Sequence, residues 1–334
     1  MKRWELKSLG AANLKLANAT QPVPAAGEVL VRVGATSLNF RDGMIVENGA
    51  NVTLDFPFTP LSDMAGEVAA LGEGVTRFAV GDKVISIVIP GWIDGVLASR
   101  NIPTQGGPIP GMLSEYVVTP AEWLVRAPST LSAAEASTLP LAALTAWMAV
   151  VELGRVRAGQ TVVVQGTGGV SIFALQFAAA HNARVIVTSG SDDKLSRAIQ
   201  LGATDGINRQ TTPQWHQRVI ELTGGRGADH VLEMAGGDNF ARSVQAVNSG
   251  GRVSIIGLLE SAELRAPIMP IIYGGVSIVG VSIGPRRVLE DMVRAIDQSG
   301  IRPAIDTVYD FENAREGFAH LKRGAFGKIV IQVN

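Results

Sequence analysis

A glycine-rich segment in the middle of the chain has the residue types and spacing that bind a phosphate. Thr161–Val164 is an apolar, β-branched run typical of a buried strand, and after Gln165 the sequence Gly166-Thr-Gly-Gly-Val-Ser171 leads into an apolar-periodic segment typical of a helix. Glycines at such a junction let the backbone approach a pyrophosphate and aim the amino end of the helix at it. The segment predicts a dinucleotide site, with a tight turn that binds no ligand as the alternative.

The individual positions of this segment have separate roles. Gly166 permits the tight turn, and Gly168 lets the backbone approach the phosphates. The third glycine of the usual G-x-G-x-x-G pattern is replaced by Ser171, which is small enough to keep helix and strand close. We therefore expect the cofactor to be bound by Gly166, Thr167, Gly168, Gly169 and Val170.

The next strand indicates which dinucleotide binds. NAD-binding proteins usually place an acid at the end of this strand, for the ribose hydroxyls. Here the strand 184–188 is followed by Ser189, and the two acids Asp192 and Asp193 fall in the first turn of a helix. Ser189 and Lys194, together with Ser191 and at longer range Arg197, can instead bind a 2′-phosphate. The pattern favours NADP(H) over NAD(H), unless Lys194 is only a solvated helix charge.

Composition limits the class of protein. The 334 residues fit two domains, and 46% hydrophobic with 18% charged residues describes a well-buried globular protein. A net charge of −1 gives no electrostatic reason to expect nucleic acid or an acidic membrane surface as a partner. The absence of cysteine excludes disulfides and thiolate chemistry. The segment Met1–Leu6 lacks the apolar core of a signal peptide, so we expect a cytoplasmic protein.

The elements that must position these residues divide the chain. The first 125 residues are β-rich, with strands at 29–33, 66–71, 83–88 and 115–118. A Gly- and Pro-rich stretch at 89–111 predicts a long loop, either a cover for a site or a simple surface loop. Ser132 and Glu135 form a capping box that opens an Ala-rich helix.

Strands and helices alternate beyond that point. Strand–helix alternation at this spacing predicts an α/β fold with a Rossmann-type doubly wound parallel sheet. A tail with helices at 286–299 and 312–323 and strands at 306–309 and 327–333 returns to the first domain. We therefore predict a substrate domain over 1–128 and 276–334 and a dinucleotide-binding domain over 129–275. The predicted strands are 161–164, 184–188, 205–207, 230–233 and 251–256, and the helices are 169–181, 192–201, 213–223 and 238–249.

From Val29 onward the chain resembles the medium-chain dehydrogenase/reductase superfamily, in its zinc-free branch near the quinone oxidoreductases. The motifs that carry the resemblance are Ser37-Leu-Asn-Phe-Arg-Asp42, Pro60-Leu-Ser-Asp-Met-Ala-Gly-Glu-Val68, Gly72–Val84, Leu139–Trp147 and Gly327-Lys-Ile-Val-Ile331. The resemblance implies a GroES-like fold for the β-rich substrate domain.

The resemblance also identifies where a metal would be expected. Zinc members of the superfamily bind the ion with Cys, a Gly-His-Glu motif and a second Cys or Asp, and the matching positions here are Asn39, Leu61–Asp63 and Leu141. A set without thiolate or imidazole does not make a tetrahedral zinc site, so we expect no metal. Without a Lewis acid, the expected chemistry is hydride delivery to a quinone, enone or similar activated double bond.

Three residues are candidates for catalysis. By resemblance Asn39 lies beside nicotinamide and substrate, where its amide would donate to the substrate oxygen; a turn-stabilising Asn is the alternative. Asp42 follows in the same motif, at a position where relatives have a residue that lines the cleft, and a structural ion pair between Asp42 and Arg41 is the alternative. Asp63 would serve as a catalytic acid if it is buried, and a buried network with Arg41 is the alternative. Apolar cleft lining is expected from Met44, Phe58 and the loop around Trp92.

Further cofactor contacts follow only from the resemblance. Thr145 is expected near the nicotinamide or the phosphates, and Lys328 at the pyrophosphate. Arg209 replaces a tyrosine that is usual in relatives after Ile207-Asn208, and it would stack on the adenine, bind the 2′-phosphate or face solvent. Relatives pair the edge strand that corresponds to Val276–Ile283 across a two-fold axis, so we expect a homodimer. The remaining expected cofactor residues, at strand ends, are Asn208, Gly236, Ile256 and Gly257.

The histidines and tyrosines offer no recognisable proton donor. His181, His216, His230 and His320 have no acid or serine at an interpretable spacing, so we expect surface or capping roles. The sequence thus predicts a zinc-independent, NADPH-dependent reductase. A metal-free carbonyl or alcohol oxidoreductase and a non-catalytic NADP(H)-binding protein remain open.

Overall fold

A computed structural model describes residues 1–99 and 101–334, and contacts divide them into two compact units. The first unit is Met1–Leu144 with Ile283–Asn334, and the second is Thr145–Ser282. The units divide at 144/145 and 282/283, further along the chain than the boundaries predicted from the sequence at 128/129 and 275/276. The long loop predicted at 89–111 contains only the two-residue strands β6 (Thr104–Gln105) and β7 (Pro108–Ile109), and its residue 100 lies outside the described residues.

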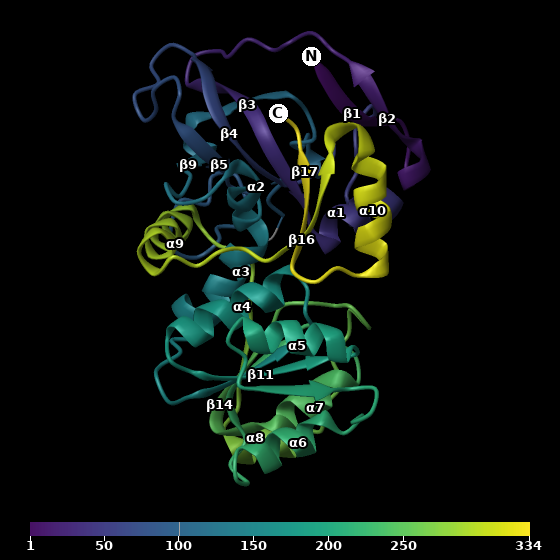
Figure 1. The fold of residues 1–334 in the computed structure, drawn as a ribbon, viewed down its shortest axis with the longest axis vertical. Helices are drawn as coiled ribbons and strands as arrows, with labels where there is room; N and C mark the ends of the chain where they lie inside the picture. The colour runs from purple at the N-terminus through teal and green to yellow at the C-terminus, as the bar shows by residue number, and fades with distance from the viewer. Residues whose placement is uncertain (100) are drawn as a thin grey trace. The chain divides into compact units, whose positions relative to one another are not determined.

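The second unit is a parallel sheet with connecting helices (Figure 1). Its strands pair in the order β12-β11-β10-β13-β14-β15, and each neighbouring pair is parallel. This confirms the Rossmann-type doubly wound sheet. The strands are β10 (Thr161–Gln165), β11 (Arg184–Ser189), β12 (Asp205–Asn208), β13 (Ala228–Glu233), β14 (Val247–Ile255) and β15 (Ser277–Gly280). The helices are α4 (Gly169–Ala180), α5 (Asp192–Gln200), α6 (Trp215–Leu222), α7 (Asn239–Ala246) and α8 (Ile268–Gly274).

The strand order determines where a ligand can bind in this unit. Chain order runs outward in one direction from β10 to β12 and in the other from β13 to β15, so the order reverses between β10 and β13. A crevice forms outside the carboxyl ends of the strands at such a reversal, and open α/β sheets bind ligands there. Gln165 and Glu233 are the last residues of the two strands that flank it.

The first unit is built on a mainly antiparallel sheet in the order β16-β17-β3-β4-β5-β9, with β8 also paired to β3. A separate hairpin joins β1 and β2. The strands are β1 (Lys2–Leu6), β2 (Leu14–Asn18), β3 (Glu28–Leu38), β4 (Asp63–Leu71), β5 (Lys83–Ser86), β8 (Tyr116–Pro120), β9 (Leu124–Arg126), β16 (Ile305–Asp310) and β17 (Lys328–Gln332). The helices are α1 (Phe40–Asn48), α2 (Ala133–Ala136), α9 (Arg286–Ser299) and α10 (Ala314–Arg323).

Register brings three strand ends of this sheet together. Ile329 of β17 pairs with Leu38 of β3, and the antiparallel direction then sets Lys328 beside Asn39. On the other side of β3, Ser37 pairs with Asp63, the first residue of β4. Asn39, Asp63 and Lys328 are therefore neighbours although they are far apart in the sequence.

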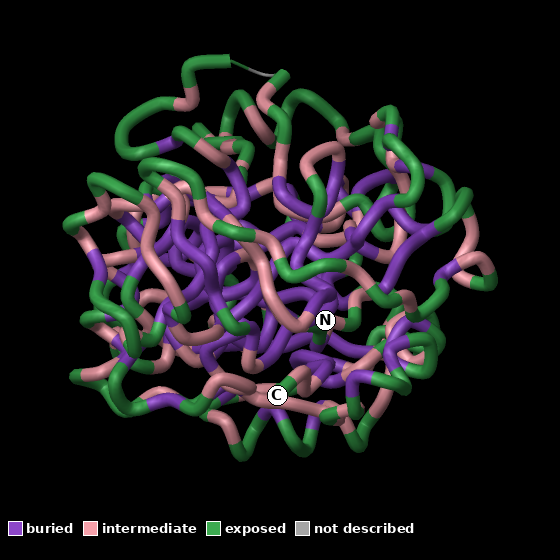
Figure 2. The backbone as a smooth tube through the Cα atoms, turned by 90° about the horizontal axis from the view of Figure 1, so that it is seen from above, coloured by how far each residue is buried: buried purple, intermediate pink, exposed green. Residues whose placement is uncertain are grey.

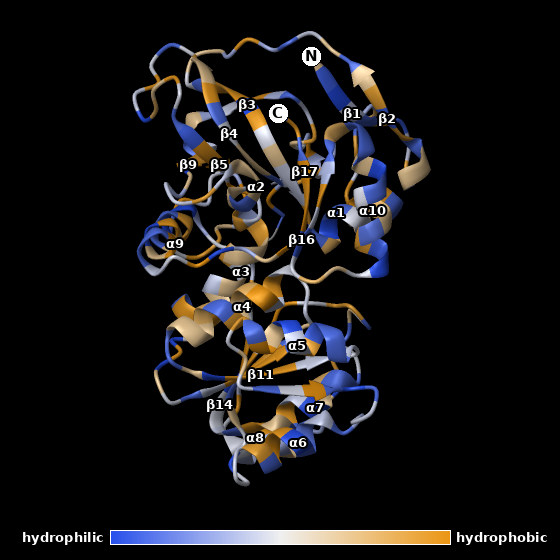
Figure 3. Cartoon of the chain, in the orientation of Figure 1, coloured by the Kyte–Doolittle hydropathy of each residue, from blue (hydrophilic) through white to orange (hydrophobic). Residues whose placement is uncertain are grey.

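Figure 2 draws the buried residues in purple, and apolar clusters of them lie within the first unit and within the second. Phe58 is 1% exposed and packs with Trp4, Leu6 and Phe318, so it belongs to the core of the first unit and not to a cleft as expected. Val162–Val164 of β10 and Val185–Val187 of β11 are fully buried apolar runs, and β11 is orange there in Figure 3, because helices cover both faces of a parallel sheet.

Several elements were not predicted. The capping box of Ser132 and Glu135 is present at α2, but α1, the β1–β2 hairpin and α8 were missed. The predicted Ala-rich helix is also broken into α3 (Leu144–Trp147) and two wider π-helical turns, Leu139–Ala143 and Met148–Glu152.

Candidate active site

A cluster of polar side chains is buried at the converging ends of β17, β3 and β4. Lys328 Nζ donates to Asn39 Oδ1 at 2.6 Å and lies 3.5 Å from Asp63 Oδ2. Lys328, Asn39 and Asp63 are 3%, 6% and 0% exposed. Buried charges persist in proteins when they are paired and hydrogen-bonded, and here one amide joins one cation to two acids.

Asn39 is the centre of this cluster. It precedes α1 in an extended conformation, so its side chain can turn back over the first turn of the helix. Its Nδ2 donates to Asp63 Oδ2 at 2.9 Å and to Asp42 Oδ2 at 3.1 Å, while its Oδ1 accepts from Lys328. Both amide protons are thus engaged, and Asn39 can donate to a substrate oxygen only by releasing a carboxylate.

Burial and charge act against each other at Asp63. Burial raises the pKa of this carboxyl from its ordinary 3.8 to about 6, although Lys328 and the hydrogen bonds from Asn39 and Ser37 lower it. The same burial lowers the pKa of Lys328, which Asp63 and Asp42 oppose. Asp63 Oδ1 is buried and has no hydrogen-bond partner in the described structure. Both partners are therefore shifted toward their neutral forms.

Asp42 and Arg41 are linked indirectly, which corrects the direct ion pair expected from their adjacency. Asp42 accepts from the Asn39 backbone amide at 2.9 Å and from Ser62 Oγ at 2.6 Å. Arg41 donates to Ser62 Oγ, and its guanidinium also binds Thr104 Oγ1 at 2.6 Å and the carbonyl oxygens of Gln105 and Gly107. Adjacent residues at the start of a helix point in different directions, so Arg41 instead holds the 104–107 segment against α1.

The cluster does not fit a zinc ion. Asn39 and Asp63, two of the positions that match zinc ligands in relatives, surround a lysine ammonium. Zinc prefers thiolate and imidazole ligands, and a carboxylate and an amide beside a fixed cation do not supply them. Within residues 1–99 and 101–334, no group of three or more His, Cys, Asp and Glu side chains is arranged to hold a metal.

The predicted phosphate-binding turn lies in the second unit, at the carboxyl end of β10. Gly166 has φ 77°, a conformation that favours glycine, and Gly168 caps the amino end of α4. A Cβ at Gly168 would have no atom within 4 Å, so open space lies in front of this helix terminus. Ser171 Oγ donates to the Gln165 carbonyl at 2.8 Å, which ties the helix to the strand. The turn thus has the form that a pyrophosphate requires.

The end of β11 carries the residues expected at the ribose. Ser189 is 4% exposed, and its Oγ accepts from the Ser191 amide at 3.3 Å. Ser191 caps α5 by accepting from the Lys194 amide. Asn208 Nδ2 donates to Asp192 Oδ1 at 2.8 Å, so a carboxylate lies in the first turn of α5 and is held by a predicted cofactor residue. The local charge is mixed, since Lys194 and Asp192 are close in sequence.

Gly236 and Gly257 are fixed by packing between backbones. A Cβ at Gly236 would lie 2.1 Å from the Ser261 carbonyl oxygen, and one at Gly257 would lie 2.2 Å from that of Met234. The turn after β13 therefore packs directly on the segment after β14, which contains Ile256. Thr145, the first residue of the second unit, is 5% exposed.

The histidines differ from expectation in three of four cases. His181 caps the end of α4 as predicted. His216 and His230 are buried, at 7% and 6% exposed, because α6 and β13 are packed elements of the second unit. His320 does have an acidic partner: its Nε2 lies 3.2 Å from Asp306 Oδ2, and its Nδ1 is 3.2 Å from Tyr309 Oη. Sequence spacing missed this group because α10 packs on β16.

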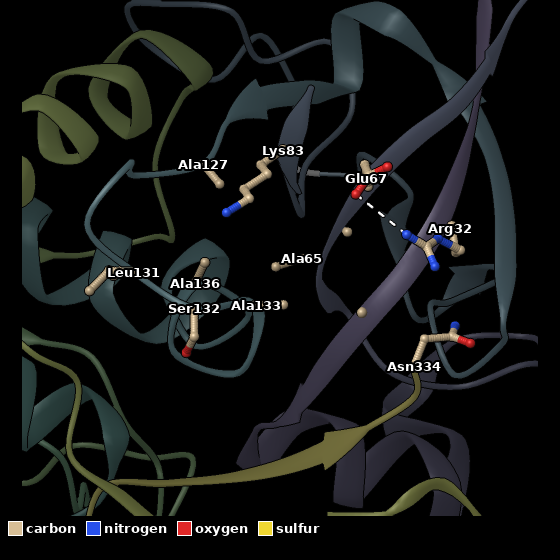
Figure 4. A pocket seen from close by; sticks show the side chains of 12 residues that line it. Arg32, Ala65, Glu67, Lys83, Ala127, Leu131, Ser132, Ala133, Ala136 and Asn334 are labelled. Atoms are coloured by element: carbon tan, nitrogen blue, oxygen red, sulfur yellow. Dashed lines mark hydrogen bonds and ion pairs between the residues drawn. The ribbon is translucent and has the colours of Figure 1, made fainter. Parts of the chain in front are cut away.

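A hollow of about 230 Å³ in the first unit lies apart from the buried cluster. Figure 4 shows Lys83 pointing into it and Arg32 paired with Glu67 at its rim. Its lining shares no residue with the cluster around Asn39, and the predicted catalytic residues do not open into it.

Comparison with known proteins agrees with this organisation. Residues 25–129 match the family model for the alcohol dehydrogenase GroES-like domain, and residues 169–298 match the model for a zinc-binding dehydrogenase. The chain is 38% identical to a zinc-type alcohol dehydrogenase-like protein of Schizosaccharomyces pombe, covering 92% of this chain and 91% of the relative. It is 27% identical to a quinone oxidoreductase of Sus scrofa, covering 93% and 90%.

Solved structures of alcohol dehydrogenases are also similar to this chain over its whole length. A candidate alcohol dehydrogenase from Sinorhizobium meliloti 1021 is 50% identical with a TM-score of 0.96, over 99% of this chain and 98% of that one. An NAD-dependent alcohol dehydrogenase is 35% identical with a TM-score of 0.91, over 100% of both chains. No helix of the described residues is long and apolar enough to cross a membrane.

Proposed function

The chain belongs to the medium-chain dehydrogenase/reductase superfamily, whose members are oxidoreductases that bind nicotinamide cofactors, and we propose that it transfers a hydride from NADPH to a quinone, enone or similar activated double bond without a metal. The observation that carries this proposal is the cluster of Lys328, Asn39 and Asp63. A lysine ammonium is placed among residues that match zinc-ligand positions, so the fixed positive charge of the site belongs to the protein itself.

The residues present suit an acceptor whose charge can delocalise. Hydride addition to the β-carbon of an enone breaks the carbon–carbon π bond and moves an electron pair onto the carbonyl oxygen, which later takes a proton. Lys328 polarises the Asn39 amide by donating to its Oδ1, and such a bond strengthens the donors on the same amide. We propose that Asn39 releases Asp42 or Asp63 and donates to the enolate oxygen.

NADPH is proposed because β11 ends in hydroxyls. Ser189, Ser191 and Lys194 lie where a 2′-phosphate would be bound, and the end of the strand itself carries no carboxylate. Two observations favour NAD(H) instead: the Asp192 carboxylate lies in the first turn of α5, and one similar solved structure is an NAD-dependent alcohol dehydrogenase. The Lys328 ammonium has three N–H donors. One binds Asn39 and one faces Asp63, and we propose that the third donates to the pyrophosphate.

A homodimer is proposed from the edge of the second unit. β15 ends the sheet order, and α8, which packs on β14 and precedes β15 in the chain, is mostly apolar, as its orange colour in Figure 3 shows. An exposed apolar edge is a risk for aggregation unless another copy covers it. We propose that the cytoplasmic enzyme pairs through this surface, whose exposed apolar residues are Leu258, Leu259, Leu264, Ile268, Met269, Ile272, Tyr273 and Ile278.

Oxidation of NADPH and NADH against quinones, enones, aldehydes and ketones tests the proposal. If quinones or enones are the only acceptors that are reduced, the proposed function is supported. Reduction of aldehydes or ketones would assign the chain to carbonyl chemistry. Tight NADPH binding with no turnover of any acceptor would make it a non-catalytic binding protein.

A further inference from the structure

Two buried side chains meet below the crevice between β10 and β13. Val164 pairs with Leu232 in the sheet, so the next residues, Gln165 and Glu233, end the two strands side by side. Gln165 Nε2 donates to Glu233 Oε2 at 3.2 Å. Glu233 is 0% exposed and Gln165 is 6% exposed. Within the described residues, no lysine or arginine forms an ion pair with Glu233, so hydrogen bonds must compensate its buried charge.

These hydrogen bonds come largely from the turn that follows β13. Glu233 Oε1 accepts from the backbone amides of Ala235 at 2.8 Å and Gly236 at 2.9 Å. Gln165 Oε1 accepts from the amide of Met234 at 3.1 Å. Three successive amides of one turn are thus bound by two side chains beneath it. Charge-assisted bonds of this kind are about twice as strong as neutral ones.

The start of α7 completes the enclosure of the carboxylate. Asn239 Nδ2 lies 3.1 Å from both oxygens of Glu233, and Ser243 Oγ donates to Oε2. Asn239 Nδ2 also donates to Gln165 Oε1 at 3.0 Å. Both oxygens of Glu233 are surrounded by donors, and the first turns of α7 place a partial positive charge there.

We propose that Glu233 is the positioning residue for the cofactor crevice: its carboxylate fixes the Met234–Gly237 turn and the spacing of β10 and β13, and so sets the affinity for the nicotinamide cofactor. This inference rests on the proposed function, because it assumes that the crevice binds a dinucleotide. Glu233 acts through the turn, since its buried carboxylate faces the turn amides and α7.

A glutamine cannot replace this carboxylate. An NH₂ group in place of Oε1 would face the amides of Ala235 and Gly236. These backbone N–H groups can only donate, and the turn fixes their direction. An NH₂ group in place of Oε2 would face the Gln165 amide, and rotating that amide would withdraw its oxygen from Met234. Either orientation opposes donor to donor in a buried site, which costs more than losing one hydrogen bond at the surface.

The same strand supplies a matched control at its other end. Asp229 Oδ2 accepts from the Thr161 amide at 2.7 Å, so it also joins β13 to β10, but at their amino ends. Glu233→Gln and Asp229→Asn therefore make the same chemical change in the same two strands, at the crevice and away from it. Ser243→Ala keeps the carboxylate but removes one donor to Glu233 and the acceptor of Gln165 Nε2, and it is the milder variant if Glu233→Gln does not fold.

The experiment measures equilibrium binding of NADPH and NADH by nucleotide fluorescence, together with hydrogen exchange of the Ala235 and Gly236 amides. We expect Glu233→Gln to raise the Kd about tenfold and Ser243→Ala about threefold, with faster exchange of both amides and an unchanged KM for the acceptor. Asp229→Asn should leave the Kd unchanged.

The outcomes are distinguishable. Equal effects of Glu233→Gln and Asp229→Asn, or protected Ala235 and Gly236 amides in Glu233→Gln, would overturn the positioning role while the proposed function stands. A wild-type chain that binds neither nucleotide would refute the proposed function and with it any effect of Glu233 on affinity.

Discussion

Lys328 and Asn39 are 289 positions apart in the sequence, yet their side chains share a hydrogen bond of 2.6 Å. The antiparallel register of β17 and β3 produces this contact, because Ile329 pairs with Leu38. Lys328 Nζ also lies 3.5 Å from Asp63 Oδ2, so the buried cluster contains a cation of its own. The proposed chemistry depends on this charge.

Removal of that charge should impair the reaction more than the fold. In Lys328→Met the aliphatic chain stays buried while the ammonium is lost, so Asn39 is no longer polarised. We expect kcat with the preferred acceptor to fall at least tenfold, or about 1.4 kcal/mol of transition-state stabilisation. Steady-state kinetics measure this, with Lys83→Met, an exposed lysine of the same unit, as the control. A kcat within twofold of wild type would exclude Lys328 from the chemistry.

The pH dependence of stability should reveal the burial of Asp63. Its pKa is raised to about 6 in the folded protein from 3.8, so the folded state holds the proton more tightly than the unfolded state. The stabilisation is complete below about pH 4 and is lost as the pH rises through about 6. Relative to Asp63→Asn, wild type should therefore lose stability between pH 4 and 6, in chemical denaturation at several pH values. A gain over this range would mean that Lys328 outweighs desolvation.

Local patterns predicted the fold better than the site. Strands such as β10 and helices such as α5 follow from apolar periodicity, which is contained within each segment. The contacts of Lys328 with Asn39, and of Gln165 with Glu233, depend on which strands pair and in what register. Sequence spacing does not contain that information. Asn39 and Asp63 were selected through a family resemblance, whereas Glu233 was missed because its role depends on Gln165, which lies on a neighbouring strand and is far from it in the sequence.

Gly168→Ala tests the nucleotide site without disturbing the fold. The added methyl meets no atom within 4 Å and φ is −78°, so stability should be unchanged or slightly higher. The methyl would occupy the space proposed for the pyrophosphate, so NADPH affinity should fall at least tenfold. Thermal unfolding and a fluorescence titration measure the two effects.

Gly236→Ala should differ from Gly168→Ala in thermal unfolding. Its methyl would lie 2.1 Å from the Ser261 carbonyl oxygen at a φ of 76°, so the melting temperature should fall. If Gly168→Ala instead binds NADPH as wild type does, the phosphates do not lie at the start of α4.

Preference for the phosphorylated cofactor should depend on Lys194. Without its ammonium the 2′-phosphate loses a charged partner, while NADH has no group at that place. We expect Lys194→Ala to raise the Kd for NADPH about tenfold and to leave that for NADH unchanged. Arg197→Ala, one turn further along α5, serves as a control and should have a smaller effect. A wild-type preference for NADH of tenfold or more would refute the NADPH proposal.

The apolar edge of the second unit should hold two copies together. Ile272 on α8 and Ile278 on β15 are 60% and 41% exposed, and a charge on either would be buried unpaired in a dimer. We expect Ile272→Glu to sediment as a monomer and wild type as a dimer in analytical ultracentrifugation. Val96→Glu, at a 94% exposed side chain of the first unit, should remain dimeric. A monomeric wild type would contradict the proposed interface.

Metal-free hydride transfer can be followed with a labelled cofactor. Enzyme treated with a strong chelator and shown by elemental analysis to hold less than about a tenth of a metal ion per chain would be assayed with NADPH carrying deuterium at C4 and an enone acceptor. We expect full turnover, deuterium at the β-carbon of the product, and no change on adding zinc. Loss of activity with the metal and its return with zinc would contradict metal-free transfer.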